Sequence, residues 1–210
     1  SLGKCVKSFN SHTHIVSAVS FSHNNRLLAS SSYDRTVRLW DIITGQCIKV
    51  LQGHSSEVHS VAFNPDDNIV VSSGADYTIR LWDITTGECI DILYGHTQII
   101  RSVIFSADGK YLVSCSTDTT IRLWDFNRRS CITTLKGHLN AIRSVAIDSE
   151  NTTIVSGSQD GTIKLWDFNT GECFKTIKGD RPYERMNITG IKGLTEAEIT
   201  TLKALGAVEE

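Results

Sequence analysis

Four residue types that could share protons recur together along the chain, always in the order histidine, serine, aspartate, tryptophan. Every member of a set returns after 42 residues. The four sets are His12, Ser30, Asp34 and Trp40; His54, Ser72, Asp76 and Trp82; His96, Ser114, Asp118 and Trp124; and His138, Ser156, Asp160 and Trp166. A carboxylate can accept a hydrogen bond from an imidazole, the imidazole from a hydroxyl, and the hydroxyl from an indole N–H. Each bond contributes about 0.5–1.5 kcal/mol net, so a complete set could hold one folded unit together.

Serine, histidine and aspartate also form the nucleophilic triads of hydrolases. A triad is needed once, whereas this set occurs four times with identical spacing. Repetition in every unit is typical of a structural frame, and we therefore predict no catalytic residues. The four histidines are also poor candidates for metal ligands, because no second histidine or cysteine follows three or four residues away. Since no glycine-rich phosphate loop is present either, we expect no metal and no cofactor.

The cysteines follow the same period. Five of the six occupy one strand position in successive units: Cys5, Cys47, Cys89, Cys131 and Cys173. Side chains so placed cannot bring their Cα atoms within the roughly 7 Å that a disulfide needs. Cys115 stands alone. We expect six unpaired thiols that pack as small buried apolar side chains in a reducing compartment.

The composition predicts a folded, strand-rich protein. Of its 210 residues, 40% are hydrophobic, and the β-branched Val, Ile and Thr, which favour strands, number 57. The formal net charge of −2 argues against a basic nucleic-acid groove or a polybasic membrane patch. No stretch of 18 apolar residues could span a membrane, and no secretory signal begins the chain. We expect a cytoplasmic protein without nucleic-acid or membrane partners.

Four short strands and their turns fit into each 42-residue unit. In the unit that starts at residue 45, the expected strands are 45–51, 58–63, 69–73 and 78–82. The short turns between them make neighbouring strands antiparallel. One such sheet cannot bury both of its faces, whereas sheets stacked around an axis cover each other, as in a β-propeller.

The combination of Gly-His and Leu-Trp-Asp at a constant period resembles the WD40 repeat family. The motifs are Gly53-His54 with Leu81-Trp82-Asp83, Gly95-His96 with Leu123-Trp124-Asp125, and Gly137-His138 with Leu165-Trp166-Asp167, while the first unit has Ser11-His12 with Leu39-Trp40-Asp41. The resemblance implies an all-β fold, a β-propeller built of four-stranded antiparallel blades. Its repeats are residues 3–41, 45–83, 87–125 and 129–167, with a last outer strand at 171–178, in a domain of residues 1–180. It also implies that each recurring set is a hydrogen-bonded tetrad holding one blade.

The propeller is expected to need further blades. Residues 3–9 match residues 171–177, which can complete blade four as its outer strand. The first segment is therefore expected to be the outer strand of a preceding blade. Four blades of a seven-bladed propeller turn through only about 206°. We expect the missing blades to come from upstream sequence or from another chain, and the isolated chain to self-associate.

The period fails after Lys178, and residues 181–210 form a tail. Thr195 and Glu198 are spaced as a capping box, so we expect a helix over about residues 195–205. Leu194 and Ile199 are placed as a hydrophobic staple, and Ile199, Leu202 and Leu205 form an apolar stripe suited to docking on the propeller. The tail resembles the C-terminal ends of long bacterial, cyanobacterial-type WD40 proteins. This implies the sensing or assembly end of a larger signalling protein.

Partner contacts are expected where the repeats differ, since identical residues serve the frame. Two positions diverge, and in the family they lie around the channel entrance: Ser17, His59, Arg101 and Arg143 at one, and Tyr33, Ala75, Thr117 and Gln159 at the other. Arg101 and Arg143 lie on neighbouring blades and could bind an acidic partner, because arginine favours bidentate recognition of carboxylates. The alternative is that both arginines are simply solvated.

The expected function is a non-catalytic scaffold for protein–protein interaction. Two alternatives stay open at this point: a sensor that binds a small molecule or peptide in the central channel, and a propeller enzyme. One local departure also has two interpretations. Arg129 stands where other units have Gly45, Gly87 and Gly171, and it marks either a solvated turn or an edge contact.

Overall fold

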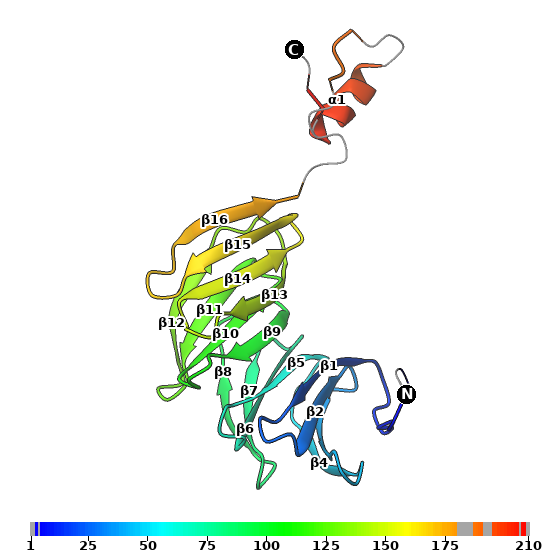
Figure 1. The fold of residues 1–210 in the computed structure, drawn as a ribbon, viewed down its shortest axis with the longest axis vertical. Helices are drawn as coiled ribbons and strands as arrows, with labels where there is room; N and C mark the ends of the chain where they lie inside the picture. Colours follow the sequence, from blue (N-terminus) through cyan, green and yellow to red (C-terminus); the bar gives the residue numbers. More distant parts are fainter. Residues whose placement is uncertain (1–2, 4, 180–186, 191–194, 206, 209–210) are drawn as a thin grey trace. The chain divides into compact units, whose positions relative to one another are not determined.

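The computed structural model describes residues 3, 5–179, 187–190, 195–205 and 207–208. The chain divides into two units, residues 1–176 and 177–210. Four antiparallel four-stranded sheets, which we number as blades one to four, make up the larger unit (Figure 1). They follow one another as the sequence pattern predicts, so the all-β class and the blade architecture are confirmed.

The strands of each blade are hydrogen-bonded in chain order. Blade one contains β1 (Val16–Phe21), β2 (Leu27–Ser32), β3 (Thr36–Asp41) and β4 (Cys47–Gln52). Blade two contains β5 (Val58–Phe63), β6 (Ile69–Gly74), β7 (Ile79–Asp83) and β8 (Cys89–Leu93). Blade three contains β9 (Ile100–Phe105), β10 (Tyr111–Ser116), β11 (Thr120–Asp125) and β12 (Ser130–Lys136). Blade four contains β13 (Ile142–Ile147), β14 (Thr153–Ser158), β15 (Thr162–Asp167) and β16 (Cys173–Lys178).

The core lies between successive blades. On β3, Val37 and Leu39 alternate with polar residues and point to one face, as expected for a half-buried strand. Both side chains are fully buried, and they form a cluster with Phe63 and Trp82 of blade two. Corresponding clusters join blade two to blade three and blade three to blade four. Each sheet therefore buries its apolar faces only against a neighbouring sheet.

The innermost strand of every blade carries a bulge near its start. In blade one the pairing passes from Val16–Ser32 directly to Ala18–Ser31, so Ser17 is the extra residue. The same shift in the other blades leaves out His59, Arg101 and Arg143. A bulge takes a residue out of the ladder and re-aims its side chain. One of the two divergent positions is thus a bulge position in all four blades.

The expected strand at residues 3–9 is wrong. Residues 5–12 have no regular secondary structure, and Val6 is almost fully exposed. A strand needs a neighbour for its backbone hydrogen bonds, and the described residues offer none at this place. The segment is held instead by side chains, because Lys7 Nζ donates to the carbonyl oxygens of Ile42 and Ile43.

The expected burial of the cysteines is also wrong for five of the six. All six carry free thiols, but only Cys115 is buried. Four of the others lie at the start of the outermost strand of a blade, at the solvent-exposed sheet edge, and Cys5 has the same repeat position in the N-terminal segment. Three of them lie beside a recurring arginine, as Cys131 does, whose sulfur is 3.6 Å from Arg122 Nη1. For Cys115, burial raises the pKa of the thiol to about 12.

The tail contains one helix, α1 (Glu196–Ala204). Thr195 caps it: its hydroxyl accepts from the Glu198 backbone N–H, and the Glu198 carboxylate accepts from the Thr195 backbone N–H. The expected helix and its capping box are confirmed, whereas Leu194 of the staple lies outside the described residues. No residue of α1 is buried, so docking of its apolar stripe stays a prediction. Among the described residues, no helix is long and apolar enough to cross a membrane.

Candidate functional site

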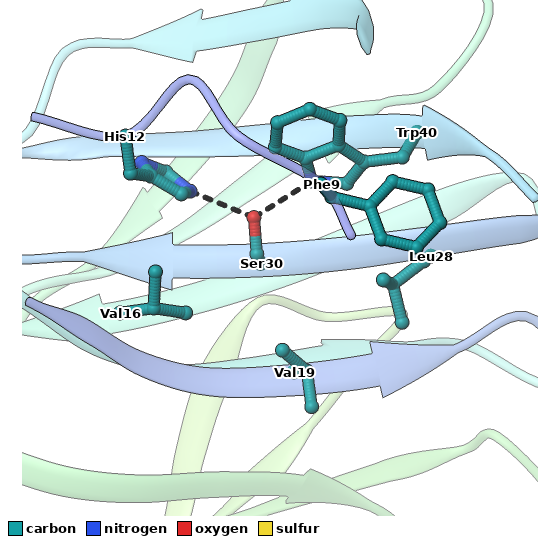
Figure 2. A pocket seen from close by; sticks show the side chains of 7 residues that line it. All are labelled: Phe9, His12, Val16, Val19, Leu28, Ser30 and Trp40. Atoms are coloured by element: carbon teal, nitrogen blue, oxygen red, sulfur yellow. Dashed lines mark hydrogen bonds between the residues drawn. The ribbon is translucent and has the colours of Figure 1, made fainter. Parts of the chain in front are cut away.

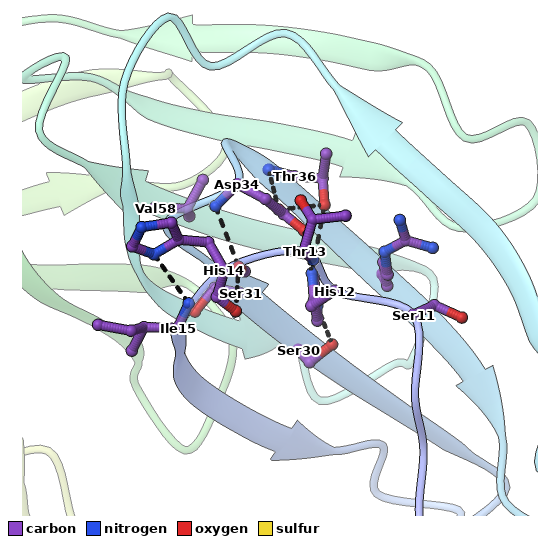
Figure 3. Close-up of polar contacts among 12 residues, drawn as sticks. Ser11, His12, Thr13, His14, Ile15, Ser30, Ser31, Asp34, Thr36 and Val58 are labelled. Atoms are coloured by element: carbon purple, nitrogen blue, oxygen red, sulfur yellow. Dashed lines mark hydrogen bonds and ion pairs between the residues drawn. The ribbon is translucent and has the colours of Figure 1, made fainter.

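The recurring side chains meet in every blade. In blade one, His12 Nδ1 lies 2.7 Å from Asp34 Oδ2 and His12 Nε2 lies 2.7 Å from Ser30 Oγ (Figure 3). The Trp40 indole N–H donates to the same Ser30 oxygen at 2.8 Å. The three corresponding distances in blades two, three and four lie between 2.7 and 2.9 Å. The geometry fits a relay in which Trp donates to Ser, Ser to His, and His to Asp.

The tetrad aspartates are held as anions. Burial alone would raise the pKa of Asp76, but hydrogen bonds from His54 and Thr78, together with the electrostatic interaction with His54, outweigh burial and lower it to about 2. Asp34, Asp118 and Asp160 have the same kinds of partner, and their pKa values are likewise lowered. Each carboxylate also accepts from the backbone N–H that follows its histidine, as Asp34 does from Thr13 at 3.1 Å. The aspartates thus tie the loop before the innermost strand to the turn after β2 and its equivalents.

The tetrad serines are buried, although Ser30 lines a pocket on blade one together with His12 and Trp40 (Figure 2). Ser72 and Ser114 are fully buried, and Ser30 and Ser156 nearly so. A nucleophilic hydroxyl must reach a reacting carbonyl, and in these sets the hydroxyl oxygen is already shared between an imidazole and an indole. The arrangement therefore suits cross-linking within a blade. Among the described residues, no group of three or more His, Cys, Asp or Glu side chains could hold a metal ion.

Divergent side chains from three blades touch one another near the bulges. The Tyr33 ring packs edge-on against the His59 ring of blade two, with centroids 5.0 Å apart. Arg101 Nη1 of blade three lies 3.4 Å from His59 Nδ1. Burial lowers the pKa of His59, helped by the positive charges of Arg101 and Arg143 and opposed by Glu57. A neutral His59 ring can accept the Arg101 hydrogen bond.

Two further candidates lie together on blade four. Arg143 and Gln159 are both exposed, and with its amide oxygen turned to the guanidinium Gln159 accepts from Arg143 Nε at 3.2 Å. Arg143 also acts electrostatically on His59. His14 also belongs to this group, although comparing the repeats with one another did not single it out. Its ring stacks on the Tyr33 ring, with centroids 5.8 Å apart. We call His14, Tyr33, His59, Arg101, Arg143 and Gln159 the inner-rim cluster.

The other three candidates do not join the cluster. Ser17 Oγ donates to the Val58 carbonyl oxygen at 2.6 Å and so links blade one to blade two. Thr117 Oγ1 bonds within its own blade, to the carbonyl of Ile99. Ala75 offers only a methyl group. Equivalent positions in the repeat thus serve different purposes in different blades.

Arg129 makes an edge contact, which decides between its two interpretations. The residue has φ 56°, as the glycine at this position would, and its guanidinium lies 4.0 Å from the centre of the Phe126 ring. Its Nε is 3.8 Å from Asp91 of the preceding blade. In blade two the same place brings Gly87 against Lys49 of blade one. Asp91 has the repeat position of Lys49, and Arg129 has the repeat position of Gly87. The two replacements occur together and form an ion pair between blades two and three.

The repeats match a known family over most of their length. The WD40 family model, described as WD domain, G-beta repeat, matches residues 3–41, 45–83, 87–125 and 129–167. The chain belongs to the WD40 repeat family. Two curated relatives align with about one repeat each: Protein Mut11 of Chlamydomonas reinhardtii, 52% identical over 42 residues, and small ribosomal subunit protein RACK1 of Candida albicans, 51% identical over 39 residues. These alignments cover 20% and 19% of this chain, and 11% and 12% of the relatives.

Proposed function

We propose that this WD40 chain is a non-catalytic scaffold that binds an acidic segment of a protein partner at the inner-rim cluster. The observation that carries the proposal is the bulge position. It places a different side chain in each blade at one end of the innermost strands, and in blades two to four these side chains are His59, Arg101 and Arg143. Membership of the family supports the broader role, because WD40 propellers generally bind protein partners.

The chemistry of the cluster favours a carboxylate. Arg101 Nε is buried and has no hydrogen-bond partner among the described residues. A buried donor without a partner costs about 1–3 kcal/mol, which a ligand oxygen would recover. Arg143 adds a second, exposed guanidinium, while Glu57 acts on His59 of the cluster with the opposite charge. An acidic peptide could bind both arginines while its apolar parts contact Tyr33 and His14.

A direct test is the affinity of the chain for a fluorescent oligo-glutamate peptide, measured by anisotropy at low salt. The Arg101→Ala/Arg143→Ala variant is expected to bind at least about tenfold more weakly, because hydrogen bonds to charged groups contribute about 1.5–3 kcal/mol each. Arg128→Ala is the matched control, since Arg128 is 83% exposed in a turn away from the cluster. Equal affinity of the double variant and the unmodified chain contradicts the proposal.

We also propose that the scaffold works within a larger cytoplasmic assembly in which further blades, from upstream sequence or from another chain, extend the four described here. Support comes from the exposed apolar face of blade one and from the five unpaired thiols outside the core. The tail's resemblance to long bacterial WD40 proteins favours the sensing or assembly end of a signalling protein.

A further inference from the structure

His59 is a titratable side chain that lies between two blades in the inner-rim cluster. It occupies the bulge position of blade two, and its ring is half-buried. On one side the Tyr33 ring of blade one packs edge-on against it, with centroids 5.0 Å apart. On the other side Arg101 Nη1 of blade three lies 3.4 Å from its Nδ1. The contacts of His59 are therefore made by the sheets on both sides of its own.

The contact with Arg101 requires one protonation state of the His59 ring. A guanidinium has only N–H donors and stays charged in proteins, so Nδ1 must be the acceptor. Nδ1 can accept only when the ring is neutral and carries its proton on Nε2. In a protonated ring Nδ1 carries a hydrogen as well, and two donors would then face each other. The contact with Arg101 therefore belongs to the neutral form of His59.

The charges around His59 also oppose its protonation. Arg101 acts on the ring from β9 and Arg143 from β13, and both side chains are positive. Burial lowers the pKa of His59 most, and the two arginines lower it further. Glu57, in the loop before β5, acts in the opposite direction and raises the pKa. The Glu57 carboxylate interacts with Arg35 too, so its charge is shared between two cationic partners.

A carboxylate bound at the cluster would reverse this balance. Arg101 Nε is buried without a hydrogen-bond partner among the described residues, and Arg143 is exposed. An anion that binds these guanidinium groups brings a negative charge close to His59. A nearby opposite charge favours the charged form of an ionisable group. The anion that the arginines attract therefore favours a protonated His59, whose Nδ1–H becomes a further donor to it.

We propose that binding of the acidic segment is coupled to the uptake of one proton by His59, so that the inner-rim cluster holds its partner more tightly as the pH falls from about 8 towards 5.5. The coupling rests on the proposed function, because it concerns the same site and the same class of partner. In the free chain His59 is neutral and accepts from Arg101. In the complex it is a cation that donates to the carboxylate of the partner.

The direction of the pH dependence follows from the reciprocity of proton and ligand binding. The anion raises the pKa of His59 in the complex above that in the free chain. By linkage, protonation of His59 strengthens anion binding by the same factor. The affinity is therefore lowest above the pKa of the complex, rises as the pH falls through it, and is constant below the pKa of the free chain.

The affinity for the fluorescent oligo-glutamate peptide tests the coupling. At about pH 5.5 the dissociation constant is expected to be about tenfold lower than at about pH 8, because one hydrogen bond between charged groups is gained. Both values exceed the usual glutamate pKa of about 4.3, so the peptide stays ionised. Equal dissociation constants at the two pH values overturn the coupling and leave the proposed function standing, whereas no binding at either pH overturns both.

Histidine variants separate His59 from other groups that titrate in this range. In His59→Asn the amide oxygen can replace Nδ1 as acceptor but cannot be protonated, so the ratio of the two dissociation constants should fall to about 1. The bulge position carries serine in blade one and arginine in blades three and four, so the blade tolerates different side chains there. His23→Gln, at a mostly exposed ring outside the cluster, is the control and should keep the ratio.

His14 also belongs to the cluster and is exposed, so its variant sharpens the comparison. His14→Gln should keep the ratio even where it changes the affinity itself, because His14 stacks on Tyr33 and not on His59. A ratio that persists in His59→Asn, or that is lost in His14→Gln alone, overturns the coupling through His59.

Proton NMR of the histidine rings measures the same coupling without relying on affinity. The His59 signals are assigned by their loss in His59→Asn. Saturating peptide should raise the pKa of His59 in the unmodified chain. Arg101→Ala should raise it in the free chain, because the change removes a positive charge and the donor to Nδ1. A pKa of His59 that is unchanged or lowered by the peptide, or that is insensitive to Arg101→Ala, overturns the coupling.

Discussion

At the residue scale, the tetrads bury an ionised carboxylate and satisfy it completely. The Asp76 carboxylate accepts from the His54 ring, the Thr78 hydroxyl and two backbone N–H groups. Removing one member leaves the others buried and unpaired, and this costs more than the bond itself. The same residues in a catalytic triad would need an exposed hydroxyl, and these are buried. Their chemistry stabilises the fold.

The tetrad role predicts a large effect of one substitution. His96→Ala should lower the free energy of unfolding by about 2–4 kcal/mol, because Asp118 and Ser114 lose a partner and a cavity remains. His23→Ala is the comparison: its ring is mostly exposed and pairs with Asp67 at 3.2 Å, so the change should cost no more than about 1 kcal/mol. Urea unfolding measures both. A stability of His96→Ala equal to that of the unmodified chain would show that the tetrads are not the frame.

The lowered pKa of Asp76 predicts the response to acid. Its folded pKa of about 2 lies below the value of 3.8 for an unperturbed carboxyl. The stabilisation is therefore complete above about pH 4 and declines as the pH falls from about 4 towards 2. Urea midpoints at about pH 5 and pH 3 should fall less for Asp76→Asn than for the unmodified chain. An equal fall in the two proteins contradicts the assignment.

The sequence predicted which residues recur and which diverge, but not what the divergent ones touch. The bulge side chains were visible because they break the repeat, as at His59 and Arg101. His14 was missed, although its equivalents Ser56, Gln98 and Asn140 also differ, because it precedes the first strand. The partner of Arg129 was missed because Asp91 lies on another blade, and pairing across blades is invisible within one unit.

At the element scale, periodicity predicted the strands well because every blade repeats the same turns. It failed at residues 3–9, which have the composition of an outer strand but no neighbour to pair with. Strand formation depends on a partner strand, and no local pattern reports whether that partner is present. The cysteine error has a related cause. Small cysteine side chains are suited to a core, but five of the six lie on the outermost strand of a blade or its N-terminal equivalent. Such a strand is at the sheet edge, so its side chains stay partly or fully exposed.

The tail helix carries a prediction of its own. A helix of nine residues is marginal in water, so α1 needs a surface for Ile199, Leu202 and Leu205. Deleting residues 190–210 should then expose apolar surface and lower the soluble fraction of the expressed chain. Thr200→Ser, a change on the same helix that keeps the apolar stripe, serves as control. Unchanged solubility together with rapid amide exchange throughout α1 would show that the helix docks on nothing.

At the scale of the whole molecule, the residues that hold the blades differ from the residues of the proposed binding site. Identical tetrads and apolar clusters hold every blade, and the inner-rim cluster carries the differences. The bulge makes this separation possible, because it frees one residue per blade from the ladder without disturbing the sheet. The side chain at the bulge can therefore differ between blades while the fold is kept, as the proposed function requires.

Hydrogen–deuterium exchange with and without the oligo-glutamate peptide tests this separation most directly. The account predicts slower exchange in the peptide complex at the starts of β5, β9 and β13, around His59, Arg101 and Arg143, and unchanged exchange at β4, β8 and β12. Protection spread over the outer strands, or no protection near the bulges at saturating peptide, would contradict it.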